Sequence, residues 1–142
     1  MHLDKFKYYM PLRVRFVETD LQGHVFFGNY LIYFDEALTQ YMHAMGCNTQ
    51  DLLAAGADMF YLRSECDYHS RAFFEEVLNI HARVEKIGNS SVTFEFAAIK
   101  EANKELVARG KIIAVMVDLQ TKKPMRVPDV FREASLSCAI LE

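Results

Sequence analysis

Asp20 is the side chain whose type and position most directly predict chemistry. It lies in the stretch ETDLQGHVFFGNY, residues 18–30, at the end of a predicted strand and just ahead of a predicted helix. A helix N-terminus presents backbone N–H groups that lack intrahelical acceptors, together with a partial positive charge. A carboxylate that faces such donors across a gap could attack a carbonyl or activate water, while the donors stabilise the resulting oxyanion.

Two neighbours of Asp20 could contribute to the same chemistry. His24 lies four residues further on and has three candidate roles: binding a substrate, orienting water, or hydrogen bonding to a backbone carbonyl. A structural role is the default for a lone histidine near a turn. Alternation along a strand end would put Glu18 on the same side as Asp20, and we expect its carboxylate to be solvated.

A long helix must position these residues. Over residues 29–45 the apolar side chains recur at spacings of three and four, which predicts an amphipathic helix. Gly46 is well placed to end it. Asn48 or Thr49 is expected to cap a second, short helix that stops near Gly56.

The rest of the chain predicts strands. Alternating or β-rich patterns predict strands over 8–16, 59–68, 77–87, 92–100 and 106–119. Turn residues at Gly88-Asn89 and Ala102-Asn103 join the last three in an antiparallel meander. Pro124 and Pro128 mark the end of the regular sheet. The predicted fold class is α+β: a curved antiparallel sheet of about five strands wrapped around one long central helix, the hotdog fold.

Length and composition limit the classes of function that the chain could have. The 142 residues, which contain no internal repeat or linker, predict a single domain over 1–142. The net charge is −3, with 16 basic and 19 acidic residues, so no basic footprint for nucleic acid is present. No apolar run approaches the length of a membrane span and no signal peptide is visible, so we expect a cytoplasmic protein.

The cysteines predict neither disulfides nor metal. Cys47, Cys66 and Cys138 are odd in number, widely spaced and without a CxxC motif. Glu65, Cys66, Asp67 and His69 mix ligand types, but their spacing is not that of a zinc site and alternation would scatter them over two faces. We therefore expect no metal site.

The pattern Thr-Asp-x-x-Gly-His-Val, followed by Asn-Tyr and an aromatic-rich helix start, resembles the 4-hydroxybenzoyl-CoA thioesterase-like branch of hotdog acyl-CoA thioesterases. Similar segments occur at 83–94 and 115–128, and the resemblance covers about residues 8–132. It implies hydrolysis of an acyl-CoA to a carboxylic acid and free coenzyme A. It also implies that no cofactor is required and that the protein assembles into homodimers or homotetramers, with active sites between two subunits.

The resemblance also implies roles for individual residues. Asp20 matches the family's catalytic aspartate, acting as nucleophile or general base, and a backbone N–H at Phe27 or Gly28 would polarise the thioester carbonyl. Asn29 and Tyr30 match the pair that fixes the helix start and borders the substrate. Many relatives have a histidine at the position of Phe27, and here His24 is the nearby histidine.

Arginine and lysine side chains are the candidates for binding the phosphates of coenzyme A. Arg71 is the first choice, and Arg109 and Lys111 are further candidates. Two alternatives to the thioesterase reading remain. One is hydrolysis of acyl groups on an acyl carrier protein, and the other is a non-catalytic hotdog protein that binds an acyl-CoA.

Overall fold

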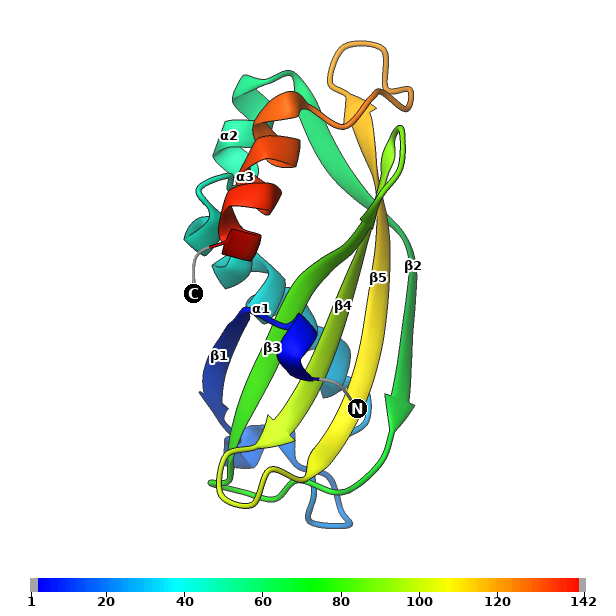
Figure 1. Cartoon of the computed structure of the whole chain (residues 1–142). Coiled ribbons are helices and arrows are strands. Elements are labelled where there is room, and N and C mark those ends of the chain that lie inside the picture. Colours follow the sequence, from blue (N-terminus) through cyan, green and yellow to red (C-terminus); the bar gives the residue numbers. More distant parts are fainter. Residues whose placement is uncertain (1–2, 141–142) are drawn as a thin grey trace.

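The computed structural model describes the backbone of residues 3–140 and the side chains of residues 3–137 (Figure 1). The strands are β1 (Tyr8–Arg13), β2 (Ala57–Tyr68), β3 (Val77–Ile87), β4 (Ser91–Lys100) and β5 (Leu106–Asp118). The helices are α1 (Asn29–Met45), α2 (Thr49–Ala54) and α3 (Asp129–Ile140), with short 3-10 turns η1 (Leu3–Lys5) and η2 (Phe16–Glu18).

The five strands form one antiparallel sheet in the order β1-β3-β4-β5-β2 (Figure 1). β3, β4 and β5 are the predicted meander, and each end of the sheet has a free edge, at β1 and at β2. The sheet curves along α1, which packs on one of its faces. The predicted α+β hotdog architecture is therefore confirmed.

The core lies between α1 and the sheet. Phe34 of α1 stacks on Phe96 of β4 with ring centroids 5.1 Å apart, and both are fully buried. Gly110 of β5 makes this approach feasible, because a Cβ there would collide with the Phe34 ring and lie 2.8 Å from the Glu65 carbonyl oxygen. Gly46 ends α1 in the left-handed conformation, with φ of 85°, as predicted. Asn48 caps α2 by accepting from the N–H of Asp51.

Two parts of the fold differ from the prediction. The first strand ends at Arg13, because the backbone of Val14 pairs with Glu75 and Glu76, and Phe16 begins the exposed turn η2. The last strand ends at Asp118, ahead of both prolines as predicted, and the chain after Pro128 forms α3, a helix that was not predicted. The carbonyl of Pro128 accepts from the N–H groups of Phe131 and Arg132, so this proline sits where a helix tolerates it.

Candidate active site

A cleft of about 350 Å³ lies beside the start of α1. Three segments line it: the turn before α1, the first residues of α1, and the end of β2 with the residues that follow. The lining residues are Gln22, His24, Val25, Phe27, Tyr30, Tyr68, His69, Ser70 and Arg71. The structure thus brings four predicted site residues together here: His24, Phe27, Tyr30 and Arg71.

Asp20 lies in the tight turn that forms one wall of this cleft. Its N–H donates to the His24 carbonyl (2.9 Å), and its carboxylate accepts from the N–H of Gln22 (2.9 Å). Gly23 closes the turn with a φ of 85°, a conformation that favours glycine. Asp20 is therefore in a loop that follows η2, not at a strand end as predicted. It is half-buried and adjoins the cleft without lining it.

The start of α1 leaves two amides available. The N–H of Asn29 donates to Phe26 and that of Tyr30 to Phe27, but the N–H groups of Phe27 and Gly28 donate to no residue that the structure describes. A Cβ on Gly28 would lie 2.9 Å from the ring of Phe26, which is 45% exposed. The family resemblance implies an oxyanion donor at Phe27 or Gly28, and that role stays a prediction.

Aromatic side chains form the wall around these amides. Tyr30 is buried, with 3% of its surface exposed. Burial raises its pKa to about 12, although a hydrogen bond from the backbone of Ala72 acts in the opposite direction. The Tyr68 hydroxyl donates to the Phe27 carbonyl (3.3 Å), and its ring meets those of Phe27 and Tyr30 edge to face. Phe27 itself is 62% exposed.

His24 is engaged within its own turn. Its Nδ1 lies 3.1 Å from the Val25 carbonyl oxygen and its Nε2 lies 3.0 Å from Oε1 of Gln22. Of the three roles considered for this histidine, the geometry corresponds to hydrogen bonding with a backbone carbonyl. The ring still borders the cleft, where it meets Phe73 edge to face.

Asn29 does not line the cleft. Its Nδ2 donates to the Glu18 carbonyl (2.9 Å), which ties the first residue of α1 to the turn η2. This contact corresponds to the predicted role in fixing the helix start, and not to substrate binding. Glu18 is not the solvated carboxylate that was expected, because Arg15 and Tyr33 both bind it and only 15% of its side chain is exposed.

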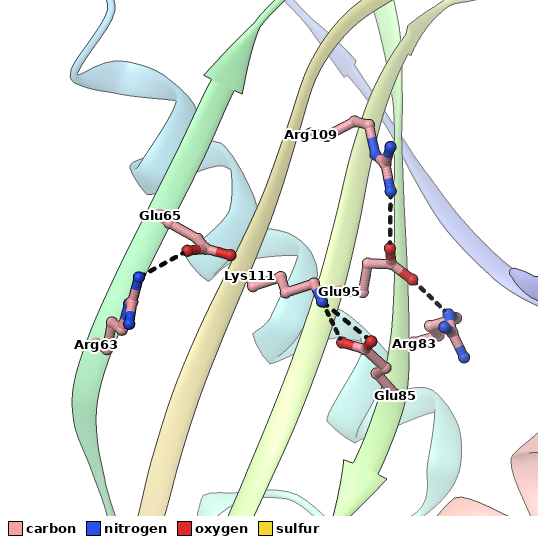
Figure 2. Close-up of polar contacts among 7 residues, drawn as sticks. All are labelled: Arg63, Glu65, Arg83, Glu85, Glu95, Arg109 and Lys111. Atoms are coloured by element: carbon pink, nitrogen blue, oxygen red, sulfur yellow. Dashed lines mark hydrogen bonds and ion pairs between the residues drawn. The ribbon is translucent and has the colours of Figure 1, made fainter. Parts of the chain in front are cut away.

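The candidate phosphate-binding cations separate into two places. Arg71 is exposed, lines the cleft and makes no ion pair with another described residue. Arg109 and Lys111 lie instead on the face of the sheet turned away from α1, where Glu95 and Glu85 pair with them (Figure 2). Those two cations are therefore not part of this cleft.

Five of the nine lining residues were not predicted: Gln22 and Val25 in the turn before α1, and Tyr68, His69 and Ser70 in one segment at the end of β2. The segment that holds them is tied to β5, since the N–H of His69 donates to the Val107 carbonyl and the Ser70 hydroxyl to the Leu106 carbonyl, both at 2.8 Å. The end of a predicted strand was their only sequence signal. Their approach to the start of α1 depends on how the sheet curves.

Some other predictions concern features outside the cleft. Cys47 and Cys66 are free thiols, and burial raises the pKa of both. The side chain of Cys138 lies outside the described residues. Within residues 3–137, no three His, Cys, Asp or Glu side chains gather in a way that would hold a metal ion. No helix in the described part of the chain is long and apolar enough to cross a membrane.

A curved antiparallel sheet that packs against one long helix defines a hotdog-fold protein. Residues 14–135 match the model of the thioesterase-like superfamily, and the chain belongs to that family.

Individual relatives agree with this assignment. The chain is similar to a putative esterase of Aquifex aeolicus, with 31% identity over 72% of this chain and 87% of that protein. It is also similar to the acyl-CoA thioesterase YbgC of Haemophilus influenzae, with 26% identity over 87% of this chain and 90% of that protein.

Solved structures show the same fold. A hypothetical protein from Aquifex aeolicus superposes with a TM-score of 0.82 at 27% identity, covering 90% of this chain and 98% of that one. A 1,4-dihydroxy-2-naphthoyl-CoA thioesterase from Synechocystis superposes with a TM-score of 0.84 at 17% identity, covering 91% and 95%, and this likeness concerns the fold alone.

Proposed function

We propose that this protein is an acyl-CoA thioesterase, which hydrolyses an acyl-CoA to a carboxylic acid and free coenzyme A. The observation that carries the proposal is the pair of free N–H groups, on Phe27 and Gly28, that opens α1 at a cleft. Similarity to the Haemophilus influenzae acyl-CoA thioesterase supports the substrate class.

In the proposed reaction, the thioester carbonyl accepts hydrogen bonds from these amides. Its oxygen gains negative charge as a nucleophile adds to the carbon, and donors fixed in advance lower the barrier by about 3–4 kcal/mol for each effective bond. The carbon–sulfur bond then breaks, and its electron pair leaves with sulfur as the coenzyme A thiolate, which takes a proton from water or from the Asp20 carboxyl that water has protonated.

Asp20 supplies the nucleophile in this proposal. Its carboxylate either attacks the carbonyl and forms an anhydride that water then opens, or removes a proton from an attacking water. The turn that contains Asp20 is joined to the cleft wall through Gln22 and His24. Arg71 at the cleft is proposed to bind a phosphate of coenzyme A, since its guanidinium is exposed and pairs with no described carboxylate.

Self-association is proposed to complete the site. β2 is an edge strand in which nine of 12 residues are exposed, and Phe60 and Leu62 are 62% and 61% exposed. An edge with free backbone groups and apolar side chains favours pairing with another chain. A second copy joined there would cover this edge, and the assembly is proposed to be a homodimer or homotetramer. Sedimentation equilibrium measures it, and a monomer at micromolar concentration would reject it.

The test of the proposed function is a panel of acyl-CoA substrates assayed with the parent protein and Asp20→Asn. The asparagine keeps an oxygen that accepts from the N–H of Gln22, so the turn should persist while the nucleophile is lost. We expect kcat to fall by about 10²–10⁴-fold. Absence of hydrolysis by the parent, or full activity in Asp20→Asn, would reject the proposal. The non-catalytic alternative predicts acyl-CoA binding without turnover in both proteins.

An assay of the same acyl groups attached to acyl carrier protein decides whether the substrate is carried by coenzyme A or by that protein. Of the nine residues that line the cleft, all of them described, Arg71 is the one lysine or arginine. An acidic carrier protein would need a broader basic surface, so we propose coenzyme A as the carrier.

A further inference from the structure

Glu18 joins the two segments that carry the proposed chemistry. Its backbone carbonyl accepts from the N–H of Phe26 and from Nδ2 of Asn29, both at 2.9 Å. Phe26 and Asn29 flank Phe27 and Gly28, whose amides are free. Asp20 follows Glu18 by two residues. One residue therefore connects the segment of the carboxylate to the segment of the amides.

The side chain of Glu18 adds a second set of hydrogen bonds between the same two segments. Its Oε1 accepts from the N–H of Arg15 (2.8 Å) and from the hydroxyl of Tyr33 (3.0 Å). Its Oε2 accepts from Nε and Nη2 of Arg15, at 3.2 and 3.1 Å. Tyr33 lies on α1, one turn beyond Asn29, and only 2% of its surface is exposed. The carboxylate therefore binds the turn η2 and the body of the helix together.

We infer that Glu18, held by Arg15 and Tyr33, is a positioning residue that sets the location of Asp20 relative to the free amides of Phe27 and Gly28. The inference rests on the proposed function for its catalytic consequence. Glu18 touches no reacting atom in it, because its oxygens are taken up by these four residues, Arg15, Phe26, Asn29 and Tyr33. We call this set, with Glu18, the Glu18 clamp.

The physical reason is the steep dependence of such reactions on geometry. A displacement of about 1 Å between a nucleophile and its target can cost about 100-fold in rate. Apart from the clamp, few backbone contacts hold the loop 19–28. They are the Thr19–Val25 and His24–Phe73 bridges, the bonds from the N–H of Thr19 to Phe16 and of Val25 to Ala72, and those within its own turns. Without the clamp, the segments before and after this loop would move relative to each other. Binding of the coenzyme, which is proposed to involve Arg71, would be affected less than turnover.

Kinetics of three variants and a control test this inference. Tyr33→Phe removes one hydroxyl from the clamp, Glu18→Ala removes the whole carboxylate, and Glu18→Gln restores one acceptor oxygen. The control, Tyr41→Phe, is the same change at another buried tyrosine of α1, whose hydroxyl accepts from the N–H of Val84 on β3.

On the best acyl-CoA of the panel, we expect kcat to fall about 10- to 100-fold in Glu18→Ala and several-fold in Tyr33→Phe, with KM changed less than about threefold. Glu18→Gln should recover part of the loss, and Tyr41→Phe should keep the parent kcat. If Tyr33→Phe and Glu18→Gln both have the kcat of the parent, the inference is wrong. An equal fall in Tyr41→Phe, at an equal loss of unfolding free energy, would also overturn it by showing a general effect of stability.

Amide hydrogen exchange provides a readout that does not depend on activity. The Phe26 N–H is bonded to the Glu18 carbonyl, so Tyr33→Phe should speed its exchange at least several-fold while Tyr41→Phe leaves it unchanged. Unchanged exchange in Tyr33→Phe and Glu18→Gln would overturn the clamp whatever the activity. If the parent hydrolyses no acyl-CoA but the exchange changes as expected, the proposed function fails and the clamp stands as a structural joint.

Discussion

The outer face of the sheet, which is turned away from α1, differs from the cleft at the start of α1 in whether its polar groups have partners within the chain. On the face of the sheet turned away from α1, charged side chains of β2, β3, β4 and β5 pair with one another: Arg63 with Glu65, Lys111 with Glu85, and Glu95 with both Arg83 and Arg109 (Figure 2). At the cleft, Arg71 and the amides of Phe27 and Gly28 have no partner among the described residues.

The polar groups of the outer face therefore stabilise the fold, whereas those at the cleft are available to bind a ligand. A polar group bonded within the chain contributes to folding and offers little to a substrate. A donor left free at a cleft contributes nothing to folding but can bind charge as it develops. Changes in the two regions should therefore affect different measurements.

The sharpest test of this comparison is the same chemical change, carboxylate to amide, in both regions. Asp20→Asn should remove activity and keep the unfolding free energy within about 0.5 kcal/mol of the parent. Glu95→Gln should lower the unfolding free energy by about 2 kcal/mol and keep kcat/KM within about twofold. Urea denaturation and initial rates measure both quantities on each variant. If Glu95→Gln also abolishes hydrolysis, the two regions do not differ in function as stated.

The reason for the loss in Glu95→Gln is the environment of that carboxylate. Burial acts to raise the pKa of Glu95, but hydrogen bonds and charges from Arg83 and Arg109 outweigh burial and hold it below its usual value. Only 11% of this side chain is exposed. A glutamine would turn an NH₂ group toward one guanidinium and leave both cations without a counter-charge.

A second comparison concerns arginines. Arg71→Ala should raise KM for acyl-CoA about tenfold, equivalent to about 1.4 kcal/mol, with kcat little changed, because the contact proposed for Arg71 is to the coenzyme and not to the reacting carbonyl. Arg63→Ala is the control on the outer face, where the pair with Glu65 is largely exposed and contributes little. Equal KM values for Arg71→Ala and the parent would remove Arg71 from the binding site.

Tyr68→Phe should have a smaller effect, a decrease in kcat of about threefold to tenfold. The Tyr68 hydroxyl donates to the Phe27 carbonyl, which belongs to the same peptide group as the Gly28 N–H. Its loss makes that N–H a weaker donor to the oxyanion. Tyr68 is half-exposed, so the unfolding free energy should barely change. Steady-state kinetics and urea denaturation measure the two effects, and an unchanged kcat would show that the peptide does not need this bond.

The smallest expected effect is the pH dependence contributed by His81 on the outer face. Burial lowers the pKa of His81, and Lys104 adds to this shift. Its Nδ1 is buried without a partner in the described chain, and its ring contacts Phe6 and Tyr9. Below a pH of about 6.5 the unfolded chain binds a proton that the folded chain resists, so the unfolding free energy falls as the pH falls.

His81→Phe should therefore show a smaller loss of unfolding free energy than the parent between pH 7.5 and pH 5.5. The kcat/KM profile should be unchanged by this substitution, since His81 does not line the cleft. Denaturation curves at both pH values measure the slope. Equal slopes in the two proteins would mean that His81 does not contribute to the pH dependence.

The sequence predicted the elements whose residues repeat regularly. The three- and four-residue spacing of α1 predicted its bounds at 29–45, and alternation predicted β3 at 77–87. α3 was not predicted, because Pro124 and Pro128 ahead of it indicated only the end of the sheet. The proline at 128 was in fact the signal of a helix start.

The site was predicted in part, for a similar reason. The amides at Phe27 and Gly28 follow from where α1 begins, a local property. The wall formed by Tyr68 and the bond from Tyr33 to Glu18 join residues 41 and 15 positions apart in the chain. Such contacts depend on the curvature of the sheet and the path of the loop 19–28, which no spacing within a single element reveals.

The central claim is that the free amides at the start of α1 bind the carbonyl oxygen of a thioester opposite Asp20. The most direct measurement is a crystal structure with an acyl-CoA analogue in which a methylene separates the carbonyl from sulfur, so that it resists hydrolysis. The account predicts the analogue's carbonyl oxygen within about 3 Å of the Phe27 or Gly28 nitrogen, with an Asp20 carboxylate from the same or a second subunit facing the carbonyl carbon. An analogue bound with its carbonyl away from these amides, or with no Asp20 near it, would contradict the account.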